Sequence, residues 1–231
     1  MKTIAIIPAR GGSKGIPGKN ILKICGKHLI DYSIESAIDS NKISDVWVSS
    51  DDEKILEVAR KSQEVRLHHR KSTISQDNSS VVDTIKALLE EYSNANYPDF
   101  IVLLQPTSPI REAKQIDEAI SLLEANPEML SLISVCPMDD VHPARMYWKE
   151  NLSIEPILEK YEQTRRQEIP LAYYRNGSIY IVRTKAFLEN NSLMVKPSIG
   201  YEMPESMLLN IDTPRDVLIA EPLINAWKNG L

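Results

Sequence analysis

The sequence predicts an α/β protein with a doubly wound, mostly parallel sheet and a projecting arm. Short apolar runs alternate with amphipathic stretches from the N-terminus to Val135. This rhythm is typical of parallel strands joined by right-handed helical crossovers. It breaks in residues 137–172, which are rich in Pro, Tyr and charged side chains and have no clear period. We therefore expect one domain over residues 1–231, with residues 137–172 inserted as an arm.

The expected strands are short runs rich in apolar and β-branched residues. Such runs are typical of parallel strands, because both faces of the sheet are covered. Phe100–Leu104 has almost no polar residue and is expected at the centre of the sheet. The other expected strands are Ile4–Ile7, Asp45–Ser49, Val65–His68, Leu130–Val135 and, after the arm, Ser178–Val182.

The expected helices have apolar residues three and four positions apart, which places these side chains on one face. This spacing occurs in Leu29–Ile38, Asp51–Lys61, Val82–Leu89 and Glu112–Ala125. A last helix begins after Thr213, which is a good N-cap. Pro214 then occupies the first helical position, and Asp216 completes a capping box with Thr213.

Composition and charge exclude several classes of protein. The net charge of −5 argues against general nucleic-acid binding, which rewards basic surfaces. The two cysteines, Cys25 and Cys136, are far apart and indicate neither a disulfide framework nor a zinc site. The apolar run at the N-terminus is much shorter than the about 18 residues that a spanning helix needs, and no small-residue cleavage site follows it. We therefore expect a cytoplasmic protein without nucleic-acid or membrane partners.

The loop Pro8–Asn20 follows the first expected strand, where doubly wound sheets bind ligands. Its glycines let backbone N–H groups approach an anion, and Arg10, Lys14 and Lys19 add positive charge. This combination is more typical of a loop that binds a triphosphate than of a solvated surface loop. The loop is not a Walker A motif, since positions 13 and 20 are Ser and Asn, and no dinucleotide fingerprint is present.

Two segments resemble the signatures of one enzyme family. Pro8–Asn20 contains Pro-Ala-Arg-Gly-Gly-Ser-Lys-Gly followed by Lys-Asn, and Leu103–Arg111 reads Leu-Leu-Gln-Pro-Thr-Ser-Pro-Ile-Arg. Both resemble the CMP-sialic acid synthetases, which include cytidylyltransferases for N-acetylneuraminic, legionaminic and pseudaminic acids. Weaker resemblances follow in family order at Val48–Asp51, Arg165–Pro170, Asn176–Ile181 and Asn210–Pro214. The resemblance implies a Rossmann-like nucleotidyltransferase that transfers CMP from CTP to a sialic-acid-type nonulosonic acid and releases pyrophosphate.

The resemblance also implies which residues meet CTP. Arg10, Lys14 and Lys19 would hold the triphosphate, and Arg10, Lys19 and Asp212 would act at the reacting phosphate. The other expected nucleotide contacts are Gly11, Gly12, Ser13, Asn20, Arg70, Ser79 and Ser80. Lys71 stands where the family has Pro after its Arg, and the two serines could instead cap the following helix.

On the sugar side, the resemblance implies Gln105, whose amide can both donate and accept hydrogen bonds. Tyr180 could line a pocket for an acyl group or could pack in the core. Arg165 or Arg166, on the arm, could reach the substrate of a second subunit or could be solvated. The apolar residues of the arm and the family's dimers together imply a homodimer.

The implied cofactor is Mg²⁺ or Mn²⁺. Asn210 and Asp212 are two residues apart, so they face the same side of an extended segment. The family has Asp-x-Asp here, and this chain has Asn at the first position. We expect Asp212 to be the metal ligand and Asn210 to support it, with altered Mg²⁺ binding because an amide carries no charge.

Two other functions remain open. One is a nucleotidyltransferase for another sugar, such as the eight-carbon Kdo or a sugar phosphate. The other is a relative that binds CTP without turnover, which Asn210 alone favours. The Gln105 loop and the Asn176–Ile181 stretch favour nonulosonic acids. The sequence does not identify which nonulosonic acid is used.

Overall fold

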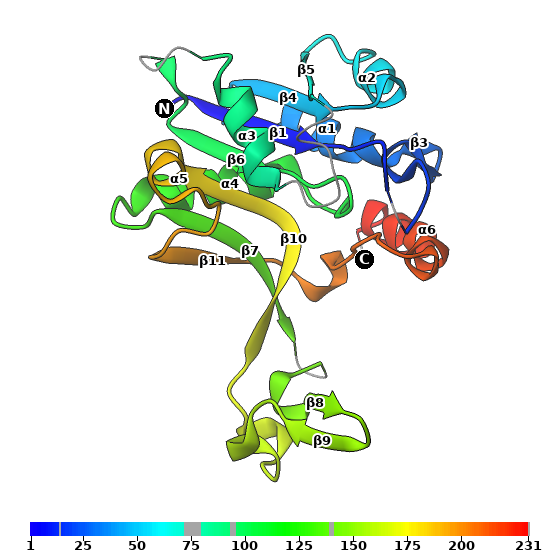
Figure 1. Ribbon diagram of the computed structural model, residues 1–231, viewed down its shortest axis with the longest axis vertical. Coiled ribbons are helices and arrows are strands. Elements are labelled where there is room, and N and C mark those ends of the chain that lie inside the picture. Colours follow the sequence, from blue (N-terminus) through cyan, green and yellow to red (C-terminus); the bar gives the residue numbers. More distant parts are fainter. Residues whose placement is uncertain (14, 72–79, 93–95, 139–140, 231) are drawn as a thin grey trace.

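The computed structural model describes residues 1–13, 15–71, 80–92, 96–138 and 141–230. Its centre is a seven-stranded sheet in the order β11-β7-β10-β6-β1-β4-β5 (Figure 1). The strands are β1 (Thr3–Pro8), β4 (Asp45–Ser50), β5 (Val65–His69), β6 (Phe100–Leu103), β7 (Ser131–Met138), β10 (Ala172–Arg183) and β11 (Ser198–Glu202). β10 runs antiparallel to β6 and β7, and the other pairings in this sheet are parallel. The predicted fold class is therefore confirmed.

Helices cover both faces of the sheet, as expected for a doubly wound fold. The helices are α1 (Leu29–Ile38), α2 (Glu53–Ala59), α3 (Val81–Leu89), α4 (Ala113–Ala125), α5 (Thr184–Asn190) and α6 (Pro214–Lys228). Residues of α1, α2 and α4 join Ala5 and Ile7 of β1 in one apolar cluster. Residues of α3 and α5 join Ile4 and Ile6 in a second cluster. Successive side chains of a strand point to opposite faces, so β1 is buried on both sides.

A third apolar cluster ties α6 to the segment that follows β1. It includes Ile16, Ile24 of β2 (Lys23–Ile24), Ile211 and Ile224 of α6. β2 pairs with β3 (Lys27–His28) in a small separate sheet. Thr213 caps α6 as predicted, and the backbone N–H of Thr213 donates a hydrogen bond to the Asp216 carboxylate. The cluster holds the loop after β1 beside the segment that precedes α6.

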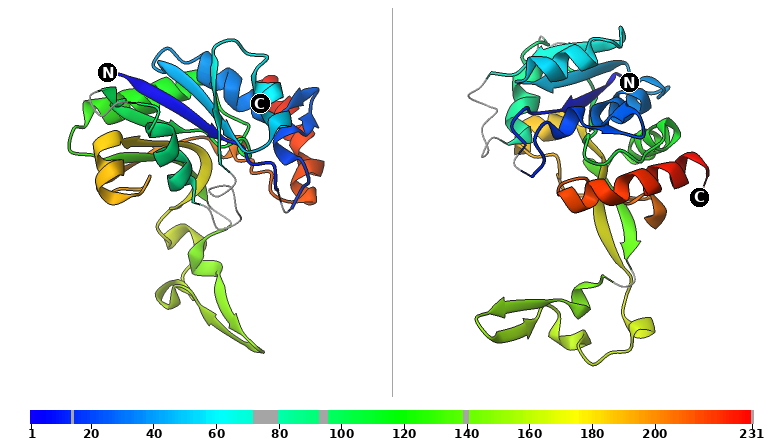
Figure 2. Two further views of the ribbon diagram at one scale, coloured as in Figure 1. Left: turned by 45° about the horizontal axis from the view of Figure 1, so that its top comes forward. Right: turned by 90° about the vertical axis from the view of Figure 1, so that its right-hand side faces the viewer.

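Between β7 and β10 the chain leaves the main sheet (Figures 1 and 2). It forms a two-stranded hairpin of β8 (Tyr147–Glu150) and β9 (Ser153–Pro156), with short 3-10 turns on either side. Large apolar side chains of the hairpin face solvent, with Trp148 69% and Leu152 99% exposed. The use of this segment as a dimerisation arm stays a prediction.

Two expectations from composition concern the described part of the chain. No helix in it is long and apolar enough to span a bilayer. Cys25 and Cys136 are both free thiols, Cys136 being buried. Burial raises the pKa of the Cys136 thiol, so it remains protonated at neutral pH.

Candidate active site

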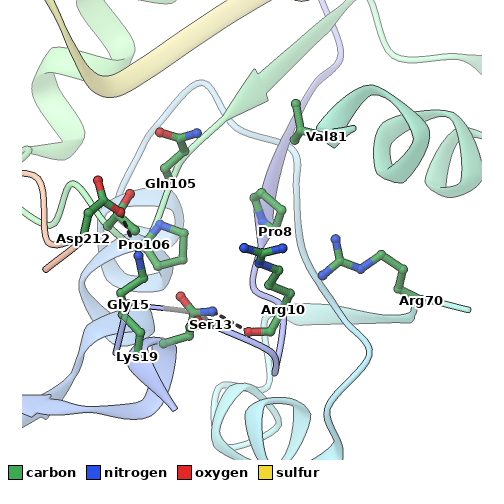
Figure 3. A pocket seen from close by; sticks show the side chains of 12 residues that line it. Pro8, Arg10, Ser13, Gly15, Lys19, Arg70, Val81, Gln105, Pro106 and Asp212 are labelled. Atoms are coloured by element: carbon green, nitrogen blue, oxygen red, sulfur yellow. Dashed lines mark hydrogen bonds and ion pairs between the residues drawn. The ribbon is translucent and has the colours of Figure 1, made fainter. Parts of the chain in front are cut away.

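A cavity of about 450 Å³ opens at the carboxyl ends of β1, β5 and β6 (Figure 3). This is the edge at which doubly wound sheets bind ligands. The loop after β1, the loop after β6, the start of α3 and the segment before α6 all contribute to it. The lining residues are Pro8, Arg10, Ser13, Gly15, Lys19, Asn20, Arg70, Val81, Gln105, Pro106, Thr107 and Asp212.

The loop after β1 is shaped by hydrogen bonds to its backbone. The Ala9 N–H donates to the Ser49 carbonyl at 2.9 Å, and the Gly11 N–H donates to Asp51 Oδ1 at 3.1 Å. The side chain of Asn20, only 5% exposed, donates from Nδ2 to the Arg10 carbonyl at 2.9 Å. Asn20 therefore fixes the backbone that carries Arg10, in addition to lining the cavity.

Arg10 and Arg70 present their guanidinium groups to the same part of the cavity (Figure 3). Burial lowers the pKa of Arg70, Asp51 opposes this shift, and the charge of Arg10 adds to it. Arg70 Nη1 donates to Thr84 Oγ1 at 2.9 Å, and Nη2 lies 3.5 Å from Asp51 Oδ1, an ion-pair distance. Arg70 Nε is buried and has no hydrogen-bond partner among the described residues. An unpaired buried donor is costly, so the Arg70 guanidinium at the cavity wall favours an anionic ligand beside it.

Lys19 and Asp212 form an ion pair at the opposite side of the cavity, with Nζ 2.8 Å from Oδ1 (Figure 3). The Lys19 side chain is 14% exposed, whereas that of Asp212 is 64% exposed. Gly15 lies against the backbone here, because a Cβ at this position would overlap the Asp212 carbonyl oxygen. The ion pair therefore joins two segments that are already in close backbone contact.

The loop after β6 is anchored by Arg111, which is 1% exposed. Its Nη2 donates to the carbonyl oxygens of Gln105, at 2.6 Å, and of Ser108. Burial lowers the pKa of Arg111, and its Nε and Nη1 have no hydrogen-bond partner among the described residues. The sequence motif contains Arg111, yet sequence reasoning assigned it no role. Its contacts indicate that it fixes the loop that presents Gln105.

Comparisons with known proteins agree with this arrangement. Residues 4–199 match the sequence model of a family described as Cytidylyltransferase. The chain is 33% identical over 224 residues to the pseudaminic acid cytidylyltransferase of Campylobacter jejuni, covering 96% of both proteins. It is 34% identical over 240 residues to the CMP-N,N'-diacetyllegionaminic acid synthase of Legionella pneumophila, covering 100% of both. The chain belongs to the cytidylyltransferase family.

Membership of the cytidylyltransferase family confirms the resemblance predicted from the motifs, and the protein is a nucleotidyltransferase. A solved structure of a CMP:2-keto-3-deoxy-manno-octonic acid synthetase complexed with CTP superposes with a TM-score of 0.71. That likeness covers 97% of this chain and 99% of the other at 18% identity, and it demonstrates a common fold.

Among the predicted nucleotide contacts of this cytidylyltransferase, the structure brings Arg10, Ser13, Lys19, Asn20 and Arg70 together in the cavity. Ser80 is the N-cap of α3, and its Oγ accepts a hydrogen bond from the Val82 N–H at 3.0 Å. Val81, which sequence reasoning missed, lines the cavity instead. Gly12 is exposed at the rim of the loop. Lys14 and Ser79 lie outside the described residues.

Three predicted sugar contacts lie apart from this cavity within the described chain. Tyr180 is 8% exposed, pairs with Leu103 in the sheet and packs in the second apolar cluster, where burial raises its pKa. These contacts favour its core role. Arg165 and Arg166 are exposed on the arm, and Arg166 lines a separate cavity of about 500 Å³ with Arg145.

Asp212 is the carboxylate that lines the cavity, whereas Asn210 is engaged elsewhere. The Asn210 Oδ1 accepts a hydrogen bond from Ser108 Oγ at 2.6 Å. In the part of the chain that the structure describes, no three His, Cys, Asp or Glu side chains form a metal-binding group. Mg²⁺ is commonly held by one or two carboxylates together with substrate phosphates and water. Asp212 therefore fits a divalent cation that arrives with a triphosphate.

Proposed function

We propose that the protein transfers CMP from CTP to the anomeric hydroxyl of a nonulosonic acid, a nine-carbon sugar acid of the sialic-acid type, and releases pyrophosphate. The observation that carries this proposal is the cavity itself, with Arg10, Lys19 and Arg70 around a space large enough for a nucleotide and Gln105 beside it. The two relatives that the chain matches over nearly their whole length are named for pseudaminic and N,N'-diacetyllegionaminic acids, and they support this class of acceptor.

In this reaction the acceptor hydroxyl attacks the α-phosphorus of CTP, and the bond from the α-phosphorus to the oxygen bridging it to the β-phosphorus breaks. Transfers of this kind depend mainly on positioning and charge neutralisation, so no nucleophilic side chain is required. Arg10, Lys19 and Arg70, together with Gly11, Gly12, Ser13 and Asn20, would form the nucleotide wall of the cavity. Lys14 is proposed to add a further cation.

Lys19 is the group best suited to stabilise charge at the reacting phosphate. Its ammonium reaches the cavity from a well-buried stem, and its present partner Asp212 is exposed and accessible. A phosphate oxygen could therefore replace the Asp212 carboxylate as the partner of Lys19. A cation held in a partly desolvated site contributes more to a charged transition state than it would in water.

We further propose Mg²⁺ or Mn²⁺ as the cofactor, held by Asp212 together with the triphosphate. When bound, the cation would neutralise phosphate charge and so favour pyrophosphate as a leaving group. Asp212 would then exchange one cation, the Lys19 ammonium, for another. This exchange leaves Lys19 available for the nucleotide.

The acceptor wall is the loop after β6, with Gln105 directed into the cavity (Figure 3). The Gln105 amide can donate to a carboxylate and accept from hydroxyl groups of the acceptor. We propose that Arg165 or Arg166 completes the site from the arm of a second subunit in a homodimer. The exposed apolar side chains of β8 and β9 support this, because they would be buried against a partner.

The test is pyrophosphate release from CTP and Mg²⁺ with N-acetylneuraminic, legionaminic and pseudaminic acids supplied separately. Release that depends on one acid, and none without sugar, is the expected result. Release with Kdo or a sugar phosphate alone would assign the enzyme to the other acceptors. Calorimetric binding of CTP without release with any acceptor would identify a relative that has lost turnover.

A further inference from the structure

Side chains of the loop after β6 and of the segment before α6 meet at Gly177 of β10, beside the acceptor wall. Gly177 lies in an irregular part of β10 and has a φ of +80°. A Cβ placed on it would lie 2.7 Å from Ser108 Oγ, 2.9 Å from Asn210 Oδ1 and 3.4 Å from Gln105 Oε1. Asn210 is therefore a close neighbour of Gln105, the residue proposed to meet the acceptor.

The Asn210 side chain acts on the loop that carries Gln105. Its Oδ1 accepts from Ser108 Oγ at 2.6 Å, and the Ser108 side chain is 1% exposed. Ser108 in turn shares a hydrogen-bonded loop with Gln105, since the Ser108 N–H donates to the Gln105 carbonyl at 3.2 Å. A carboxylate at position 210 could accept the same bond from Ser108. What distinguishes Asn from Asp here is the absence of a negative charge.

We propose that Asn210 is a positioning residue of the acceptor subsite rather than a metal ligand. Its amide oxygen holds the Ser108 hydroxyl, and through it the Gln105 loop, while its neutrality adds no second negative charge beside Gln105, where the Asp212 carboxylate is paired with Lys19. An acceptor that carries a carboxylate binds more readily at such a site. The proposal rests on the proposed function for the charge of the acceptor.

The two roles of Asn210 predict different outcomes for the same change. If Asn210 supports the metal, Asn210→Asp supplies a second carboxylate beside Asp212 and tightens metal binding. If Asn210 serves the acceptor, the same isosteric change leaves metal binding alone and places a negative charge near the acceptor carboxylate. The Asn210 amide oxygen already accepts from the buried Ser108 hydroxyl, so this contact favours the second role.

The experiment compares the wild type with N210D and with N191D, which adds the same charge at an exposed helix end. Mn²⁺ affinity is measured by electron paramagnetic resonance with CTP and no acceptor, CTP affinity by calorimetry, and the acceptor KM by pyrophosphate release. We expect N210D to raise the acceptor KM about tenfold, a typical like-charge effect, and to leave the Mn²⁺ and CTP dissociation constants within about twofold of the wild type. N191D should change none of them.

An unchanged acceptor KM in N210D overturns the proposal, and a fall in the Mn²⁺ dissociation constant of about fivefold or more assigns Asn210 to the metal instead. S108A, N210A and their double variant test the positioning role. If Asn210 acts through Ser108, the double variant should raise the acceptor KM by less than the product of the increases in the two single variants. An increase equal to that product would contradict the positioning role.

If the wild type turns over none of the acids, the proposed function fails and this proposal fails with it. A wild type that turns over beside an unaffected N210D overturns this proposal alone.

Discussion

The nucleotide wall and the acceptor wall lie on the same cavity but are built by different means. On the nucleotide wall, the loop after β1 brings Arg10 and Lys19 to the cavity, and the partner of Lys19 is an exposed carboxylate. On the acceptor wall, Arg111 and Ser108 are each 1% exposed, and their hydrogen bonds fix the loop that carries Gln105. The nucleotide wall therefore depends on charge that a ligand can exchange, and the acceptor wall depends on fixed geometry. Variants of the two walls should separate effects on catalysis from effects on stability.

The largest expected effect is on the nucleotide wall, in Lys19→Met. Loss of a cation at the reacting phosphate should lower kcat/KM by about 10²–10³. The free energy of unfolding should change by less than about 1 kcal/mol, because the lost ion pair has an exposed partner. Pyrophosphate release and urea unfolding measure the two quantities, and Lys23→Met in β2 is the control for loss of an exposed charge. A fall in kcat/KM of less than about tenfold would contradict the role of Lys19.

A steric change beside the acceptor wall should lower the free energy of unfolding, and Gly177→Ala tests this. The new methyl group would meet Ser108 and Asn210, and Ala would also be held at a φ of +80°. We expect a loss of about 2–4 kcal/mol in the free energy of unfolding. Gly26→Ala is a matched control, since Gly26 also has a φ of +80° and no atom lies within 4 Å of its added Cβ. Gly26→Ala should cost only about 1 kcal/mol, and equal losses in urea unfolding would argue against the predicted overlap at Gly177.

Arg111→Met tests whether a change in the acceptor wall weakens acceptor binding without affecting CTP binding. Without the guanidinium, the Gln105 and Ser108 carbonyls lose their common donor, and the loop should move relative to the acceptor. We expect the acceptor KM to rise about tenfold with CTP affinity unchanged. Arg111→Lys should recover part of the loss, because one ammonium can donate to both carbonyls. An equal weakening of CTP and acceptor would mean that Arg111 supports the whole cavity.

Much of this fold is predictable from sequence because its signals are local. The buried strand β6 is uniformly apolar, β1 is apolar from Ile4 onward, and α4 shows its helical period directly. The elements that sequence reasoning missed have weak signals. β11 alternates exposed and half-buried residues around Gly200 at the edge of the sheet, and β8 is exposed along its whole length. Such strands are defined by their pairing partners and not by their composition.

The candidate site divides in the same way. Arg10 and Gln105 each follow a strand directly, so their place at the edge of the sheet follows from the topology. Lys19 lies further along the loop that carries Arg10. The contact of Asn210 with Ser108 joins residues 102 positions apart, and no spacing rule could predict it. Tyr180 could face either side of the sheet from its sequence alone. Its side was decided by its pairing with Leu103 next to the helices that cover that face.

The smallest expected effect is in Ser80→Ala, which decides between the two roles of that serine. As the N-cap of α3, Ser80 accepts a hydrogen bond from the Val82 N–H, and its loss should cost about 1 kcal/mol of unfolding free energy. Ser80→Asn should restore stability, because Asn caps equally well. If Ser80 is only a cap, the CTP dissociation constant should stay within about twofold in both variants, since Val81 and not Ser80 lines the cavity. A rise in that constant in both variants, with stability recovered in Ser80→Asn, would return Ser80 to the nucleotide wall. The start of α3 would then serve CTP through a hydroxyl group as well as through the placement of Val81.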